Sequence, residues 1–181
     1  MKLSTLLHES QLSFEVKRDG EFASLGYVQH DMPAMLVFLD HEKFIERVVN
    51  HPTVACVITT PELASHIPDR LGVATTDTVR PTFFHSHNYL ATTDFYWQDF
   101  ENDISDEAVI HPSVTIAPRN VKIGRGTVIE PGVVIMERTI IGEDCTLRAN
   151  SVFGTHGFEF KRFGKEVLRV AHAGGTLLYD R

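Results

Sequence analysis

Residues 104–153 read ISDEAVIHPSVTIAPRNVKIGRGTVIEPGVVIMERTIIGEDCTLRANSVF, and this stretch decides the fold. Large apolar residues recur in it every six positions, except for one step of seven between Ile116 and Ile123. They are Ile104, Ile110, Ile116, Ile123, Ile129, Ile135, Ile141, Leu147 and Phe153. Alternate residues of a strand face opposite sides, so a six-residue period returns to one face, whereas a helix needs a period of about 3.6 residues. The stretch is therefore a hexapeptide repeat.

Each hexad can supply one short strand and one turn. Small or β-branched residues follow most of the large apolar ones by four positions, at Ala108, Val114, Thr127, Val133, Thr139, Cys145 and Ser151. We expect three hexads to close one triangular coil, and successive coils to stack at the usual strand spacing of about 4.8 Å. The large residue then points inward and the small one fills the corner. A β-sandwich with regularly spaced strands is the alternative.

The composition bounds the class of protein. The chain has 181 residues, of which 43% are hydrophobic and 23% charged, and its net charge is −7. This argues against a nucleic-acid-binding protein, which normally presents a basic face. No apolar run approaches the length of a membrane span, and the segment from Met1 to Glu9 meets a charge too early for a signal peptide. Cys56 and Cys145 lie too far apart to form a metal or redox motif, so we expect reduced thiols and a cytoplasmic location.

Residues 1–98 contain no hexads and predict an α/β domain. The predicted strands are 14–17, 22–28, 35–39, 54–58 and 71–74, and the predicted helices are 3–7, 41–49, 61–66 and 81–90. Asp40 is the expected N-cap of the helix 41–49, and Pro61 is the expected first residue of the helix 61–66. Strands that alternate with helices indicate a partly parallel sheet.

The remaining segments complete the domain prediction. Residues 99–107 are expected to form a linker, and 108–181 the first coils of a β-helix interrupted by an insertion loop at 154–175. We expect a further hexad to begin at Thr176, and nothing in the sequence covers the last coil, whose strand edge needs covering. We therefore expect the chain to be the N-terminal portion of a longer protein and to be inactive by itself.

The order of these parts resembles a known family. An α/β domain, hexads, the motif Gly154-x-x-Gly157-Phe158-x-Phe160 and the segment 175–181 (GTLLYDR) are similar to bacterial UDP-3-O-acylglucosamine N-acyltransferases of lipid A and surface-polysaccharide synthesis. The resemblance implies a left-handed parallel β-helix behind a uridine-binding domain, and a homotrimer. It implies transfer of a hydroxyacyl chain from acyl carrier protein, through its phosphopantetheine, to the amine of a UDP-linked sugar, with no bound cofactor.

The same resemblance points to two aromatic residues as the substrate-binding site. Family members hold uracil between two aromatic side chains six residues apart at a strand-to-helix junction, and Phe38 and Phe44 have this spacing. Stacking suits a flat heterocycle. The family usually has Asn and Tyr where this chain has His41 and Phe44. The alternative is that Phe38 and Phe44 are ordinary core residues.

No catalytic residue is assigned. The reaction needs a general base, usually His, and donors for the thioester oxyanion. The resemblance places that His on a later coil, beyond Arg181; His172 is a weak candidate and His156 a weaker one, because both fall in the insertion. His85 and His87 are two residues apart on a predicted helix, where they face different sides, so no metal site is expected. His111 is expected to be exposed at a coil corner.

Two alternatives remain for the function. Lys161, Arg162, Lys165 and Arg169 make the insertion basic, which fits either a surface that binds acidic acyl carrier protein or phosphate, or a solvated loop. The chain could also be a non-catalytic module for nucleotide-sugar binding or assembly, or an acetyl-coenzyme A-dependent hexapeptide acetyltransferase that uses an acyl-CoA donor.

Overall fold

The computed structural model describes all residues from Met1 to Arg181, and the chain forms two compact units. The first contains Met1–Phe95 and Phe160–Ala171, and the second contains Tyr96–Glu159 and His172–Arg181. These limits differ from the predicted boundaries in two ways. Part of the expected insertion loop belongs to the first unit, and the expected linker 99–107 already contains a strand of the second, Asp103–Ile104.

The first unit is built on one five-stranded sheet. Its strands are β1 (Glu15–Arg18), β2 (Ser24–Leu25), β3 (Met35–Leu39), β4 (Val54–Thr59) and β5 (Gly72–Thr75), in the order β1-β5-β4-β3-β2. β1 is antiparallel to β5, and the other neighbours are parallel. The buried β3 begins and ends at the residues that the sequence predicts, Met35 and Leu39, because an uninterrupted apolar run favours a strand covered on both faces.

Helices accompany this sheet, and they differ in part from the prediction. They are α1 (Leu3–Ser10), η1 (Glu42–Phe44), α2 (Ile45–Val49), η2 (Leu63–His66) and α3 (Val79–Leu90), of which η1 and η2 are 3₁₀ helices. The helix expected at 41–49 is thus a 3₁₀ turn followed by a short α-helix. Its N-cap is His41 and not Asp40: the His41 Nδ1 accepts a hydrogen bond from the Lys43 backbone N–H at 3.2 Å.

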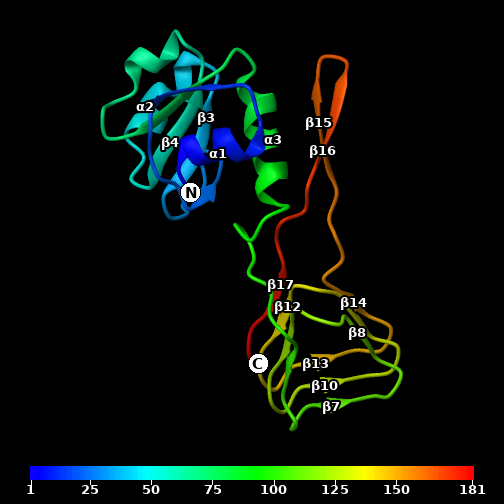
Figure 1. The fold of residues 1–181 in the computed structure, drawn as a ribbon. Coiled ribbons are helices and arrows are strands. Elements are labelled where there is room, and N and C mark those ends of the chain that lie inside the picture. The colour runs from blue at the N-terminus through cyan, green and yellow to red at the C-terminus, as the bar shows by residue number, and fades with distance from the viewer. The chain divides into compact units, whose positions relative to one another are not determined.

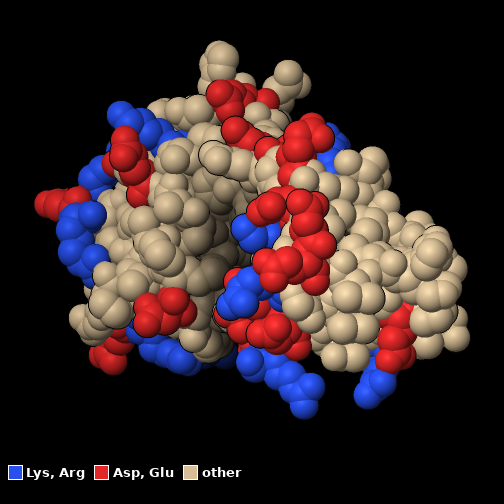
Figure 2. All heavy atoms as spheres, turned by 90° about the horizontal axis from the view of Figure 1, so that it is seen from below, with Lys and Arg blue, Asp and Glu red and all other residues tan.

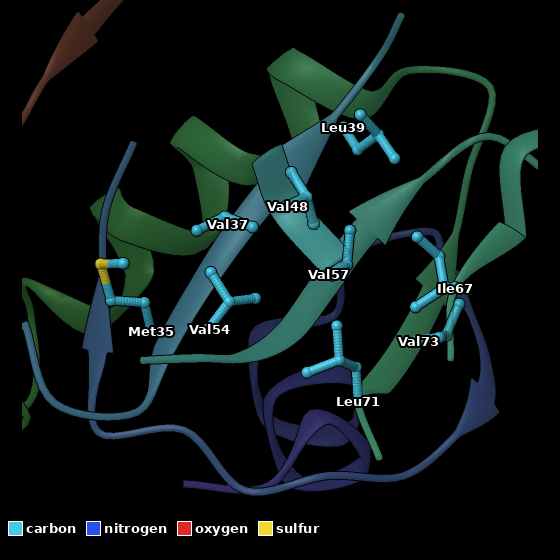
Figure 3. Close-up of a cluster of buried hydrophobic side chains, with 9 residues drawn as sticks. All are labelled: Met35, Val37, Leu39, Val48, Val54, Val57, Ile67, Leu71 and Val73. Carbon is cyan, nitrogen blue, oxygen red and sulfur yellow. The ribbon is translucent and has the colours of Figure 1, made fainter. Parts of the chain in front are cut away.

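A buried cluster of apolar side chains anchors one side of this sheet (Figure 3). It consists of Met35, Val37, Leu39, Val48, Val54, Val57, Ile67, Leu71 and Val73. The cluster joins β3, β4 and β5 to α2, and its residues are 5% exposed or less. Fully burying one such side chain contributes about 1.5–3 kcal/mol, so this cluster fixes the strands whose ends carry the site described below.

The insertion predicted as a loop is instead a β-hairpin. Its strands are β15 (Glu159–Phe163) and β16 (Glu166–Val170), which pair with each other, and Gly164 takes a φ of 62° in the turn. Figure 1 shows the hairpin alongside α3. The Phe84 and Phe163 rings lie 6.1 Å apart, which ties the hairpin to that helix.

The second unit is a stack of short parallel strands. These are β6 (Asp103–Ile104), β7 (Val109–Ile110), β8 (Thr115–Ile116), β9 (Val121–Ile123), β10 (Val128–Ile129), β11 (Val134–Ile135), β12 (Thr139–Ile141), β13 (Thr146–Leu147), β14 (Val152–Phe153) and β17 (Thr176–Leu178). They form three sheets, with strand orders β13-β10-β7, β14-β11-β8 and β17-β12-β9-β6. Figure 1 shows the coils one above another. The repeats and these parallel strands fit a left-handed β-helix.

The large apolar residues of the hexads stack inside the coils, as the period predicts. Ile110 pairs with Ile129, which pairs with Leu147, so one residue of each coil lies directly over its equivalent in the next. Ile129 and Leu147 are each 1% exposed. The chain returns from the hairpin in register, with Leu178 paired to Ile141. The hexads are therefore the units of the core.

The one seven-residue step falls at a corner formed by Asn120. This residue has a φ of 62° and is completely buried. Its Oδ1 accepts a hydrogen bond of 2.7 Å from the Phe100 N–H, and its Nδ2 donates to an Asp99 carboxylate oxygen at 2.9 Å. Asn tolerates a left-handed backbone better than most residues, and its amide here ties the corner to the segment before the first coil.

The coils also approach closely at two stacked glycines. A Cβ at Gly124 would lie 2.5 Å from the Gly142 carbonyl oxygen, and a Cβ at Gly142 would lie 2.3 Å from an Asp180 carboxylate oxygen. Neither position has room for a side chain. The glycines that follow the apolar residues in the repeat are thus required by the spacing between coils.

Several charged side chains lie beside partners of opposite sign. On the face drawn in Figure 2, Lys and Arg are interspersed with Asp and Glu. In the coils, Arg125 pairs with Glu143 and Arg148 with Glu130.

None of the helices combines the length and the apolar character needed to cross a membrane.

Candidate functional site

A pocket of about 550 Å³ opens in the first unit, where strands of the sheet end. The segment after β2 supplies residues 27–30; β3 and the residues after it supply Phe38, Asp40 and Phe44; α3 supplies Arg80; and the hairpin supplies Lys161. β2, β3, β4 and β5 run parallel, so the residues at the ends of β2 and β3, and Arg80 after β5, gather at the carboxyl ends of these strands, whereas Lys161 comes from the separate hairpin. That is where open α/β sheets usually bind ligands.

Aromatic side chains form the apolar part of the pocket. Phe38 and Phe44, the two residues predicted from their spacing, both line it. Phe38 is only half-buried, although Val37 and Leu39 on either side of it are buried. Its ring lies 6.0 Å from that of Tyr27, nearly edge-on, and 5.1 Å from that of Phe83. The structure thus brings Phe38 and Phe44 into one site, and the binding of a ligand between them stays a prediction.

His41 does not line this pocket. Its ring is exposed and caps η1, as described above. The polar side chains that do line the pocket include those of Gln29, His30 and Asp40, together with the cationic side chains of Arg80 and Lys161. Hydrogen bonds to a bound heterocycle would therefore come from these residues and not from His41.

An ion pair and a second cation give the pocket its charge. The Arg80 Nε donates to an Asp40 carboxylate oxygen at 2.5 Å, and the Arg80 guanidinium lies 5.6 Å from the centre of the Phe38 ring. The Lys161 ammonium lies 5.0 Å from the centre of the Phe84 ring and 5.9 Å from that of Tyr27. The charged side chains that line the pocket are thus those of Arg80, Lys161 and Asp40.

Sequence reasoning predicted only Phe38 and Phe44 as pocket residues, and it named Lys161 only as part of a basic surface for acyl carrier protein or phosphate. The pocket residues that it missed are Tyr27, Val28, Gln29, His30, Asp40 and Arg80. A signal was available for Asp40, because a polar residue directly after a buried parallel strand lies at the ligand-binding edge of the sheet. Arg80 lies in the first turn of α3, which follows β5, so it reaches the same edge. Lys161 carries no such signal, because its position depends on where the hairpin packs.

The structure brings the two histidines of the insertion together, outside the pocket. His156 and His172 stack with ring centroids 5.6 Å apart and an angle of 24° between the ring planes. Both belong to the second unit, and both are exposed. Neither hydrogen-bonds to an acidic group that would orient it as a base, so we assign no catalytic role to either.

The other singled-out histidines make structural contacts. The His85 Nε2 lies 3.5 Å from a Glu166 carboxylate oxygen, and the His87 Nε2 lies 2.8 Å from the Ala171 carbonyl oxygen. His111 is exposed at a coil corner, as predicted, with its Nδ1 2.8 Å from the Ser113 hydroxyl. No group of three or more His, Cys, Asp or Glu residues is arranged to hold a metal ion.

Comparison with known proteins identifies the repeats. Residues 120–155 match the family model described as bacterial transferase hexapeptide (six repeats). Similar curated proteins include the bifunctional protein GlmU of Geobacillus sp. (strain WCH70), 54% identical over 43 residues, or 24% of this chain and 9% of the relative. GlmU of Levilactobacillus brevis is 49% identical over 43 residues, which are 24% of this chain and 9% of the relative. GlmU of Listeria welshimeri is 45% identical over 51 residues, which are 25% of this chain and 11% of the relative.

These matches cover a limited part of each protein. The chain spans only about a tenth of the length of the curated relatives, and the family model covers 36 residues of the coils, from 120 to 155. Within those residues lie β9 to β14, the second and third coils, with their inward isoleucines and stacked glycines. The second unit of this protein therefore carries the hexapeptide repeats of bacterial transferases.

Proposed function

We propose that the protein is an acyltransferase for an amine of a UDP-linked sugar, in which the first unit holds the nucleotide. One observation carries the proposal: a pocket lined by Phe38 and Phe44 occurs in a chain whose other unit consists of transferase hexapeptide repeats. The repeats support an acyl- or acetyltransferase role. The nucleotide, the sugar and the acyl chain come from the family resemblance.

The pocket suits a nucleoside in size and in chemistry. Its volume of about 550 Å³ falls within the usual range of small-molecule sites, about 300–1,000 Å³. A pyrimidine could stack against the Phe38 and Phe44 rings, while Gln29 and Asp40 offer hydrogen-bonding groups at the same place. Stacking a base on an aromatic ring contributes about 1–3 kcal/mol, as measured by alanine substitution.

The proposed reaction is aminolysis of a thioester. The sugar amine attacks the thioester carbonyl carbon, the new C–N bond forms, the C–S bond breaks, and the proton lost by the amine ends on the thiol of the departing carrier. We propose acyl carrier protein as the donor and partner, a homotrimer as the assembly and the cytoplasm as the location. The alternative donor is acetyl-coenzyme A, and an assay of the complete gene product with both donors would separate them.

Titration with UDP tests the binding half of this proposal. We expect the wild-type protein to bind UDP in calorimetry and Phe38→Ala to weaken binding by about tenfold or more, because a stacking surface is lost. Phe158→Ala is the matched control, since Phe158 is 83% exposed and lies outside the pocket. A wild-type protein with no affinity for UDP, or equal affinities in both variants, would refute the proposal.

A further inference from the structure

One lysine of the insertion differs from its basic neighbours. Lys161 is half-buried and lines the pocket, whereas Arg162, Lys165 and Arg169 are exposed and do not. Its ammonium lies over the Tyr27 and Phe84 rings, at 5.9 and 5.0 Å. A hairpin inserted between two strands of the repeats thus delivers a single cation to the pocket of the first unit.

Specific contacts hold this hairpin in place on α3. Both ends of the Asn88 amide bind β16 and the residue that follows it: the Nδ2 donates to the Arg169 carbonyl oxygen at 2.7 Å, and the Oδ1 accepts from the Ala171 N–H at 2.8 Å. His87 contacts the Ala171 carbonyl oxygen at 2.8 Å. These bonds satisfy backbone groups at a hairpin edge, so they fix the register of the hairpin and hence the position of Lys161.

Arg80, in the first turn of α3, provides the second cation of the pocket. Its guanidinium is paired with Asp40 through Nε alone, so the N–H donors on the other two nitrogens remain for a ligand. Arg80 is 55% exposed at its side chain, and Asp40 is 24% exposed. A phosphate entering the pocket could therefore be bound by Arg80 without displacing Asp40.

We propose that Lys161 and Arg80 form the phosphate-binding part of the pocket, so that the site selects a nucleoside diphosphate over the corresponding nucleoside. This rests on the proposed function, because it takes the aromatic part of the pocket as the place of the base. Lys acts on phosphate as a point charge and Arg through directed N–H donors, and hydrogen bonds to a charged group are stronger than those between neutral groups. The insertion is then a specificity element of the nucleotide site.

Calorimetry of the full chain with uridine and with UDP tests this assignment. We expect wild type to bind UDP more tightly than uridine. Lys161→Ala should weaken UDP binding about tenfold or more and leave uridine binding within about twofold. Lys165→Ala is the matched control, because it removes an exposed lysine from the same hairpin. Lys161→Arg should recover most of the lost UDP affinity, because arginine keeps the positive charge. If Lys161 acted only by packing on Tyr27 and Phe84, its loss would weaken the binding of uridine and of UDP alike.

The outcomes separate this inference from the proposed function. If Phe38→Ala loses UDP while Lys161→Ala binds it as wild type does, the nucleotide site stands and the phosphate assignment fails. Equal weakening of uridine and UDP by Lys161→Ala also refutes the assignment. If wild type binds neither ligand, both proposals fail. Lys161→Gln, which keeps the length of the side chain, replaces Lys161→Ala if thermal melting shows that the alanine variant is unfolded.

Discussion

Cys56 illustrates how closely single residues are fitted in the first unit. Its side chain is fully buried on β4, between two glycines: a Cβ at Gly20 would lie 2.8 Å from the Cys56 Sγ, and one at Gly72 would lie 2.7 Å from it. Burial raises the pKa of the Cys56 thiol from 9.0 to about 12. The thiol therefore packs as a small apolar group and does not act as a nucleophile.

This raised pKa predicts how stability changes at alkaline pH. Above about pH 9 the unfolded chain ionises this thiol and the folded chain does not, so the Cys56 contribution to stability falls as the pH rises from 9 toward 12. We expect the difference in unfolding free energy between wild type and Cys56→Ala to shrink over pH 8–11 in urea titrations. Rapid alkylation of Cys56 in the folded protein, mapped by mass spectrometry at pH 8, would contradict the packing role.

Prediction from the sequence succeeds for residues whose environment is local. The inward isoleucines follow from a period. Phe38 and Phe44 line one pocket because a strand leads directly into the turn after it, and their role in binding stays a prediction. Tyr27 and Lys161 reach the same pocket from distant segments, and no spacing encodes that. Asp40 looked like a helix cap because Asp favours that position, but Arg80 engages its carboxylate instead.

At the scale of elements, the coil corners depend on the absence of a side chain at Gly124. The atoms nearest to a Cβ there belong to the backbone of Gly142 and Glu143, at 2.5–2.8 Å, and backbone cannot move aside cheaply. We expect Gly124→Ala to lower the free energy of unfolding by about 1–3 kcal/mol, measured by urea denaturation. Gly174→Ala is the control, since its Cβ would meet nothing closer than 3.9 Å; equal losses in both variants would contradict this account.

Strands and helices could be predicted from the sequence where the pattern of side chains alone determines them. Strands β7 to β14 follow the hexads, because each coil repeats the same local geometry. The prediction of one helix at 41–49 was only partly right, because the segment begins with the 3₁₀ turn η1, which His41 caps. The prediction of a loop at 154–175 was wrong for residues 159–170, where β15 pairs with β16, because neither strand shows the clean alternation of apolar and polar residues that would reveal it in the sequence.

At the scale of the whole molecule, two separate cores predict two responses to mutation. Ile129 is 1% exposed within the coils, and Val128 beside it is 37% exposed and points outward. We expect Ile129→Ala to cost about 2–5 kcal/mol and Val128→Ala less than about 0.5 kcal/mol. Hydrogen exchange should show Ile129→Ala reducing protection of amides in the second unit more than of those in β4. An equal loss of amide protection in β4 would contradict this account, because it would mean that one cooperative core spans the chain.

The first unit is discontinuous, and this has a consequence for how the protein is made. Its last segment, Phe160–Ala171, emerges from the ribosome only after the three coils formed by β6 to β14 have been translated. Domains generally fold as they emerge, at about 5–20 residues per second. The sheet and its aromatic residues can therefore assemble early, but the nascent chain acquires Lys161, and with it the complete pocket, only near the end of this sequence.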